Sequence, residues 1–171
     1  ADFDPGPGTY NLNSAGMFDI FVSKLDASGN FLWAKQLGGA STDYGISIAI
    51  DANGNVYTTG HFLGTADFDP GPGTYNLTAG YVDIFISKLD ASGNFLWAGQ
   101  LGGANIDGGE SIAVDANGNV YTTGLFTDSA DFDPGPGTYN MNSAGAYDVF
   151  ISKIDASGNF LWAGQFGGAQ G

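Results

Sequence analysis

The chain has 171 residues, of which 43% are hydrophobic and only 13% are charged, a composition that excludes a disordered protein and suffices for a buried core. Its 18 acidic residues face four lysines and no arginine, and the formal net charge is −14. Nucleic acid and anionic membranes are excluded as partners because both require clustered positive charge. The absence of cysteine excludes disulfides, thiolate metal sites and cysteine nucleophiles.

An internal repeat dominates the chain. The segment Ala-Asp-Phe-Asp-Pro-Gly-Pro-Gly-Thr-Tyr-Asn begins at Ala1, Ala66 and Ala130. A second landmark, the tryptophan of a Phe-Leu-Trp-Ala sequence, recurs at Trp33, Trp97 and Trp162. Such self-similarity is typical of repeat architectures, in which each copy is one supersecondary unit.

In chain order, the first copy supplies a Pro/Gly-rich insert and then two strands within residues 19–39. Residues 45–103 are expected to contain four strands, because their apolar residues recur with period two. They are expected at about 46–50, 56–62, 83–89 and 95–101. Asp-Ala-Asn-Gly-Asn (51–55) and Asp-Ala-Ser-Gly-Asn (90–94) join the first and last pairs as turns. The connection over 67–74 has the composition of a loop.

Four antiparallel strands per copy predict an all-β fold of propeller-type blades in tandem. The expected units are an insert loop with an outer half-blade (1–44), a full blade (45–108, insert loop 65–82) and a second full blade (109–171, insert loop 129–147). The result is about two and a half blades. Because closed propellers have about four to eight blades, the array stays open unless further blades complete it.

The residues also resemble a known family. Gly-Ile-Ser-Ile-Ala-Ile-Asp-Ala-Asn-Gly-Asn-Val-Tyr-Thr-Thr-Gly (45–60), Asp-Ile-Phe-Ile-Ser-Lys-Leu-Asp-Ala-Ser-Gly-Asn-Phe-Leu-Trp (83–97) and Leu-Gly-Gly (101–103) are similar to the SBBP repeats. That family forms seven-bladed β-propellers in secreted or surface bacterial proteins. The resemblance implies that 46–51 is an innermost strand and 95–101 an outermost one. The hairpin that ends in each tryptophan also resembles the motif by which quinoprotein propellers dock neighbouring blades, without implying a cofactor.

Paired carboxylates in the three inserts are the candidate metal site. Two acids two residues apart, beside carbonyls freed by Pro and Gly, offer oxygen ligands to a hard cation such as Ca²⁺. The alternative is that they cap Asp-Pro-Gly turns. The residues concerned are Asp2, Asp4, Asp67, Asp69, Asp131 and Asp133.

Other repeated polar and aromatic residues have a structural interpretation. The turn aspartates Asp26, Asp51, Asp90, Asp115 and Asp155 occupy a turn position that favours Asp. Lys24, Lys88 and Lys153 are expected either to pair with a carboxylate at the blade edge or to reach solvent. The three tryptophans are expected to pack between blades rather than to bind sugars. The exposed aromatic candidates for ligand binding are Tyr10, Tyr75 and Tyr139, beside the inserts.

Three functions remain open, and no catalytic residue is expected. The chain has one histidine, His61, whose counterpart in the next copy is Leu125, so no repeated base activates a hydroxyl. A calcium-dependent hydrolase is therefore the least supported function. A glycan-binding propeller that uses the inserts is the second. The favoured function is a non-enzymatic structural or adhesive module at the bacterial cell surface or outside the cell, whose partners are further copies of the same blades in a longer chain, ring or fibre.

Overall fold

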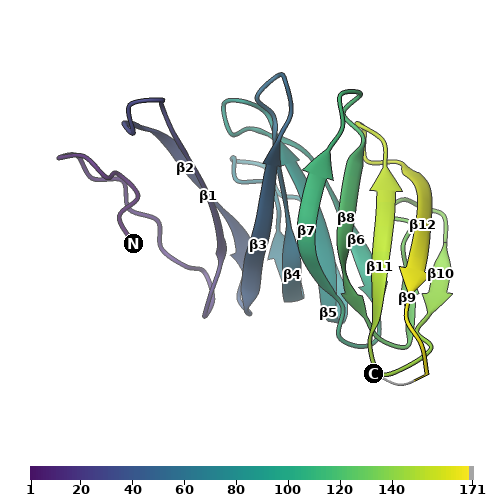
Figure 1. The fold of residues 1–171 in the computed structure, drawn as a ribbon. Helices are drawn as coiled ribbons and strands as arrows, with labels where there is room; N and C mark the ends of the chain where they lie inside the picture. The colour runs from purple at the N-terminus through teal and green to yellow at the C-terminus, as the bar shows by residue number, and fades with distance from the viewer. Residues whose placement is uncertain (170–171) are drawn as a thin grey trace.

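The computed structural model describes residues 1–169, which form strands and no helix (Figure 1). No helix in this part of the chain is therefore long and apolar enough to cross a membrane. The strands are β1 (Ile20–Leu25), β2 (Phe31–Gly39), β3 (Asp43–Ile50), β4 (Val56–Asp67), β5 (Asn76–Leu89), β6 (Phe95–Gly103), β7 (Gly108–Val114), β8 (Val120–Phe126), β9 (Ser129–Asp131), β10 (Asn140–Asn142), β11 (Asp148–Ile154) and β12 (Phe160–Phe166).

The strands form two four-stranded antiparallel blades and one half-blade. Blade A has the order β3-β4-β5-β6, and blade B has the order β7-β8-β11-β12. The half-blade is the outer pair β1-β2. The prediction of open, tandem propeller-type blades is confirmed, and the three units stand in a row from the N-terminus to the C-terminus (Figure 1).

The turns follow from their sequences. In blade A the Gly54 amide donates to the Asp51 carbonyl at 3.0 Å, and Gly54 has a φ of 80°. The Asp51 carboxylate accepts the amides of Asn53 and Asn55 at 2.9 and 3.0 Å. The other four turn aspartates make the same bonds, which confirms their structural interpretation.

The inserts depart from the predicted loop. In blade A only residues 68–75 lie outside strands, because β4 runs on to Asp67 and β5 begins at Asn76. The Thr65 and Thr78 hydroxyls are 2.9 Å apart across this extension, and the Phe68 amide donates to the Tyr75 carbonyl at 2.9 Å. In blade B the insert forms the short pair β9-β10. The expected loops at 65–82 and 129–147 are thus partly hairpins, because these polar residues still alternate and pair.

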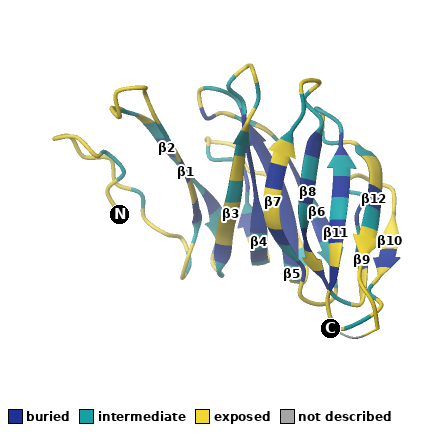
Figure 2. Cartoon of the chain, viewed as in Figure 1, coloured by how far each residue is buried: buried dark blue, intermediate teal, exposed yellow. Residues whose placement is uncertain are grey.

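Two hydrophobic clusters lie where successive units meet (Figure 2). Ile20 and Leu37 of the half-blade join Phe62, Phe68 and Phe85 of blade A. Across the next junction, Ile84, Ile86 and Leu101 of blade A join residues of blade B that include Phe132 and Phe150. The core is therefore divided between blade junctions, as expected of a repeat array in which each unit contacts its neighbours.

Candidate functional site

The same polar contact joins the units at both junctions. Trp33 Nε1 and Lys24 Nζ of the half-blade both donate to the Ala91 carbonyl of blade A, at 3.3 and 2.8 Å. Trp97 Nε1 and Lys88 Nζ of blade A donate in the same way to Ala156 of blade B, at 3.2 and 2.9 Å. We call this arrangement of Trp, Lys and Ala carbonyl the docking contact.

The accepting turn is shaped by glycine. Gly93 and Gly158, two residues after the accepting alanines, have φ values of 80° and 88°. A Cβ at Gly93 would lie 3.2 Å from Cδ2 of Trp33, and one at Gly158 would lie 3.2 Å from Cδ2 of Trp97. The indole ring of one unit therefore lies against the turn glycine of the next, and a side chain there would displace it.

The lysines extend across an aromatic ring to reach the docking contact. Lys88 Nζ lies 4.9 Å from the centre of the Tyr57 ring, and only 8% of the residue is exposed. Burial lowers the pKa of Lys88, and the Asp51 carboxylate acts in the opposite direction. The hydrogen-bond acceptor of Lys24 and of Lys88 is a main-chain carbonyl, whereas the sequence suggested either a carboxylate partner or contact with solvent.

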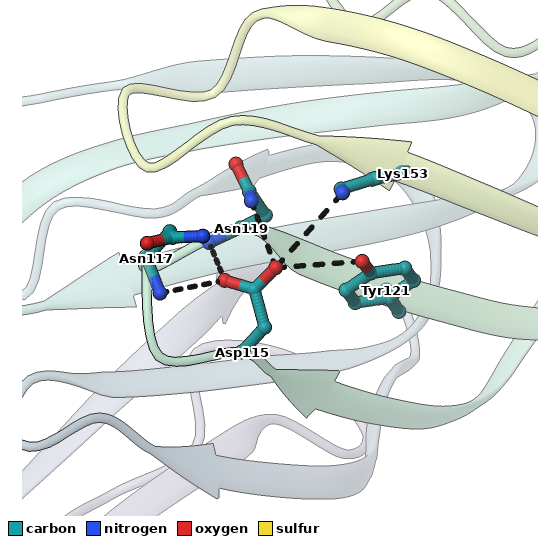
Figure 3. A network of polar contacts seen from close by, with 5 residues as sticks. All are labelled: Asp115, Asn117, Asn119, Tyr121 and Lys153. Carbon is teal, nitrogen blue, oxygen red and sulfur yellow. Dashed lines mark hydrogen bonds and ion pairs between the residues drawn. The ribbon is translucent and has the colours of Figure 1, made fainter.

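Lys153 shows the same arrangement without a following unit (Figure 3). Its Nζ lies 4.8 Å from the centre of the Tyr121 ring and 3.9 Å from Asp115 Oδ2. Asp115 in turn accepts from the main chain and side chain of Asn119 and from the Tyr121 hydroxyl (Figure 3). Lys153 thus lies over its tyrosine ring as Lys88 does, and within residues 1–169 its polar partner is this carboxylate.

A second connection ties each outermost strand to the next insert. Gly38 and Gly39 of β2 pair with Asp67 and Ala66 of blade A. Gly102 and Gly103 of β6 pair in the same way with Asp131 and Ala130 of blade B. Because the docking contact lies near the other end of these strands, each outermost strand is fixed at both of its ends.

Buried aspartates at these glycine pairs were not singled out from the sequence. Asp107, which is fully buried, accepts the amide of Gly103 at 2.9 Å and that of Thr127 at 3.0 Å. Burial raises the pKa of Asp107 to about 6, against the effect of these two amides. Asp43 makes the matching bonds at the first junction, and burial also raises its pKa. The sequence signal for both is an aspartate four residues after a Leu-Gly-Gly segment, at 37–39 and 101–103.

The insert carboxylates cap their own loops. Asp67 Oδ1 accepts the amides of Asp69 and Tyr75 at 3.0 and 2.8 Å, and Asp69 Oδ1 accepts that of Gly71 at 2.8 Å. Asp2 and Asp4, and Asp131 and Asp133, make the same bonds in their copies. Within residues 1–169 no group of three or more acidic or histidine side chains is placed to hold a metal ion. The calcium site stays a prediction that would require main-chain ligands.

The insert tyrosines pack against phenylalanines at the start of the outermost strands. The rings of Tyr10, Tyr75 and Tyr139 lie 4.8 Å from those of Phe31, Phe95 and Phe160, respectively. About two-fifths of each tyrosine is exposed, at 39%, 39% and 41%. The structure therefore presents one partly exposed aromatic pair on each unit, and nothing in it identifies a ligand.

His61 lies away from the docking contact. Its ring is 5.0 Å from that of Tyr44, and its Nδ1 atom is buried without a hydrogen-bond partner. Burial lowers the pKa of His61, and the Glu110 carboxylate of blade B opposes this effect. Among the described residues no hydrogen bond joins His61 to a Ser or Thr hydroxyl.

Two family models match the chain. The model of the SBBP β-propeller repeat matches residues 32–61 and 96–133. The model described as the sperm-tail PG-rich repeat matches residues 4–37, 69–100 and 133–169. The first covers inner and outer strands of the blades. Each match to the second begins at the Asp-Pro-Gly-Pro-Gly-Thr-Tyr segment of an insert.

Two longer proteins are similar to most of the chain. An uncharacterized WD repeat-containing protein of Acanthamoeba polyphaga mimivirus is 29% identical over 92% of the chain. The regulatory protein FlaEY of Caulobacter vibrioides is 28% identical over 91%. The chain spans only 12% and 16% of these relatives, which places repeats of this kind within much longer proteins.

The docking contact predicts unequal roles for equivalent tryptophans. Trp97→Ala should lower the free energy of unfolding by about 3 kcal/mol, because it removes packing and a hydrogen bond at the junction of blades A and B. Trp162→Ala should lower it by less than about 1 kcal/mol, because this residue is 42% exposed and no further unit packs on it within residues 1–169. Urea unfolding of dilute protein measures both, and equal losses would contradict this account.

The raised pKa of Asp107 predicts that the free energy of unfolding depends on pH between the pKa of this group in the unfolded state and its pKa in the folded state. The folded-state pKa of about 6 exceeds the unaltered value of 3.8, so the folded state retains a proton that the unfolded state has lost. The contribution of Asp107 to the free energy of unfolding should therefore be largest at low pH and fall as the pH rises from about 4 to about 6. Urea unfolding at several pH values should show this fall in the unaltered protein and a smaller one in Asp107→Asn.

Most other titrating groups contribute equally to both proteins, so the difference between the two curves isolates Asp107 together with Asp83 and Asp128, the carboxylates that interact with it electrostatically. His61, whose pKa is lowered, contributes stability that is lost as the pH falls, and it does so in both proteins. The turn aspartates have lowered pKa values, so their contribution is lost only below about pH 4. Parallel stability curves for the two proteins would rule out a titrating Asp107.

Proposed function

Because the chain belongs to the SBBP β-propeller repeat family and carries the PG-rich repeat pattern, we propose that it is a non-enzymatic structural module. Its blades would assemble with further blades of the same kind at the cell surface or outside the cell. The observation that supports this proposal is the docking contact, which occurs twice with the same atoms at equivalent positions. Units joined in this way are interchangeable, as a structural array requires.

The arrangement of polar groups favours this function over catalysis. Nucleophilic hydrolysis needs a hydroxyl or thiol beside a positioned base. The hydroxyls of Thr58 and Ser87, 2.6 Å apart, bond to each other, and the Thr59 hydroxyl donates to the Phe85 carbonyl. These hydroxyls therefore hold the strands of blade A together.

Glycan binding is the second candidate, and the insert tyrosines favour it. Three partly exposed rings, one on each unit, could each present a face to the apolar side of a sugar. Binding to a glycan array that is lost in Tyr75→Ala would support this function. Self-assembly without glycan binding would support the structural function and exclude glycan binding.

Light scattering tests the assembly. The chain should show a mean mass above its 17.6 kDa, and this mass should rise with protein concentration, because the last unit presents an uncovered copy of the docking residues. A dilution series from about millimolar to about micromolar protein covers the expected range. A mass that stays at 17.6 kDa throughout would overturn the proposed assembly.

Calcium at the inserts is tested by thermal unfolding. If the paired carboxylates hold Ca²⁺, calcium should raise the melting temperature above that in chelator, by about 2–4 °C for each kcal/mol of binding. The increase should shrink in Asp69→Asn and persist in Asp26→Asn, which alters a turn away from the inserts. Equal midpoints with calcium and with chelator would exclude the site.

A further inference from the structure

We infer that the outer hairpin β11-β12 of one copy binds the first turn (26–30) and first insert (1–11) of a second copy through the docking contact. Lys153 and Trp162 would donate to the Ala27 carbonyl of that copy. This inference rests on the proposed assembly and names the surfaces that make it. The partner is a second copy of this chain, because the chain already makes this contact with its own repeats twice.

The donor surface is a blade face that is covered at both internal junctions and uncovered on blade B. Val149 is 42% exposed, whereas its counterparts Ile20 and Ile84 are 2% and 0% exposed. Phe166 is 66% exposed, whereas Leu37 and Leu101 are each 1% exposed. Val149 pairs with Phe166, and Trp162 lies further along the same strand β12, at the C-terminal end of the array (Figure 2). The face has the composition of a buried core, and within residues 1–169 no further unit covers it.

The acceptor surface lies at the other end of the array. Within residues 1–169 the Ala27 carbonyl accepts no hydrogen bond, although its counterparts Ala91 and Ala156 each accept two. Gly29 has a φ of 81°, and a Cβ placed there would meet no atom within 4 Å. The counterpart glycines are each covered by an indole ring. The first turn thus has the same glycine conformation as the two turns that receive an indole ring, and the position of that ring is open at Gly29.

Apolar residues elsewhere on the same unit would complete the contact. Phe3 and Phe21 are counterparts of Phe68 and Phe85, which receive Ile20 and Leu37 at the first junction. Phe21 is 58% exposed, and the two rings line an open hollow of about 250 Å³. Val149 and Phe166 of the copy that supplies the hairpin β11-β12 would pack there. Within residues 1–169 no counterpart of Phe62 packs on Phe21, so the contact that these residues can make buries less apolar surface than the first junction does.

Two variants that each remove one surface test the inference. Trp162→Ala removes the donor ring, and Gly29→Ala places a methyl group where the incoming ring would lie. Each should raise the dissociation constant for self-association at least about tenfold, a size expected for an interface tryptophan. Mixed in equal amounts, the two should form a one-to-one dimer of about twice 17.6 kDa, because each retains the surface that the other lacks.

A control is available on the same strand. Leu161 is 46% exposed, and its counterparts Leu32 and Leu96 remain 51% and 47% exposed although their units are docked. Leu161→Ala should therefore associate like the unaltered chain. Thermal melts of dilute samples would show whether each variant is folded, and Trp162→Phe, which keeps a ring but lacks the N–H group, gives a second donor variant.

Analytical ultracentrifugation distinguishes the outcomes. Association that persists in both single variants would overturn this inference and leave the proposed assembly intact. Single variants that stay monomeric in the mixture, while the unaltered chain associates, would also overturn it, because the two surfaces would not then be complementary. An unaltered chain that never associates would overturn the proposed assembly and this inference together.

Discussion

The architecture depends on one acceptor, the main-chain carbonyl of the alanine in each outer turn. Two donors from the preceding unit meet there, an indole N–H and a lysine ammonium. A hydrogen bond to a charged donor is stronger than a neutral one, and at least one of these lysines is almost fully buried. Because the acceptor belongs to the backbone, its position is fixed by the turn, which in turn requires the aspartate cap and the glycine at positive φ.

The pairing between each outermost strand and the next insert fixes the orientation of neighbouring blades, which the docking contact alone would not do. A blade held only at the docking contact could still pivot about it. The pairing of the Gly-Gly segment with the next insert, supported by Asp43 or Asp107, fixes the far end of the same strand. The insert therefore connects blades, which explains why the excess length of this repeat lies there. Its Pro-Gly tip provides the turn that joins the two strands of that hairpin.

Periodicity and turn chemistry predicted the strands and blades because those features are local. Alternation from Ile46 to Ile50 and the capped turns at Asp51 and Asp90 can be read within a few residues of sequence. The acceptor of Lys88 could not be predicted in this way, because Ala156 lies 68 residues further along the chain and contributes only its backbone. The strand character of the inserts was missed because their Pro/Gly-rich tips have the composition of a loop, although the flanking residues pair with each other and with the preceding unit. Asp107 was missed because its burial arises only when two units meet.

The positions that differ between copies support the same division of roles. His61 and Glu110 replace Leu125 and Ile46, and these residues lie on inner strands, away from the docking contact. The lysines, tryptophans, turn alanines and turn glycines of the docking contact are the same in all three copies. In the array a unit supplies the donors Lys and Trp to one neighbour and the acceptor turn to the other. A change in either set would therefore disrupt a junction. A head-to-tail contact of this kind has no internal stopping point, so the rotation between successive blades determines whether the array closes into a ring or continues as a filament.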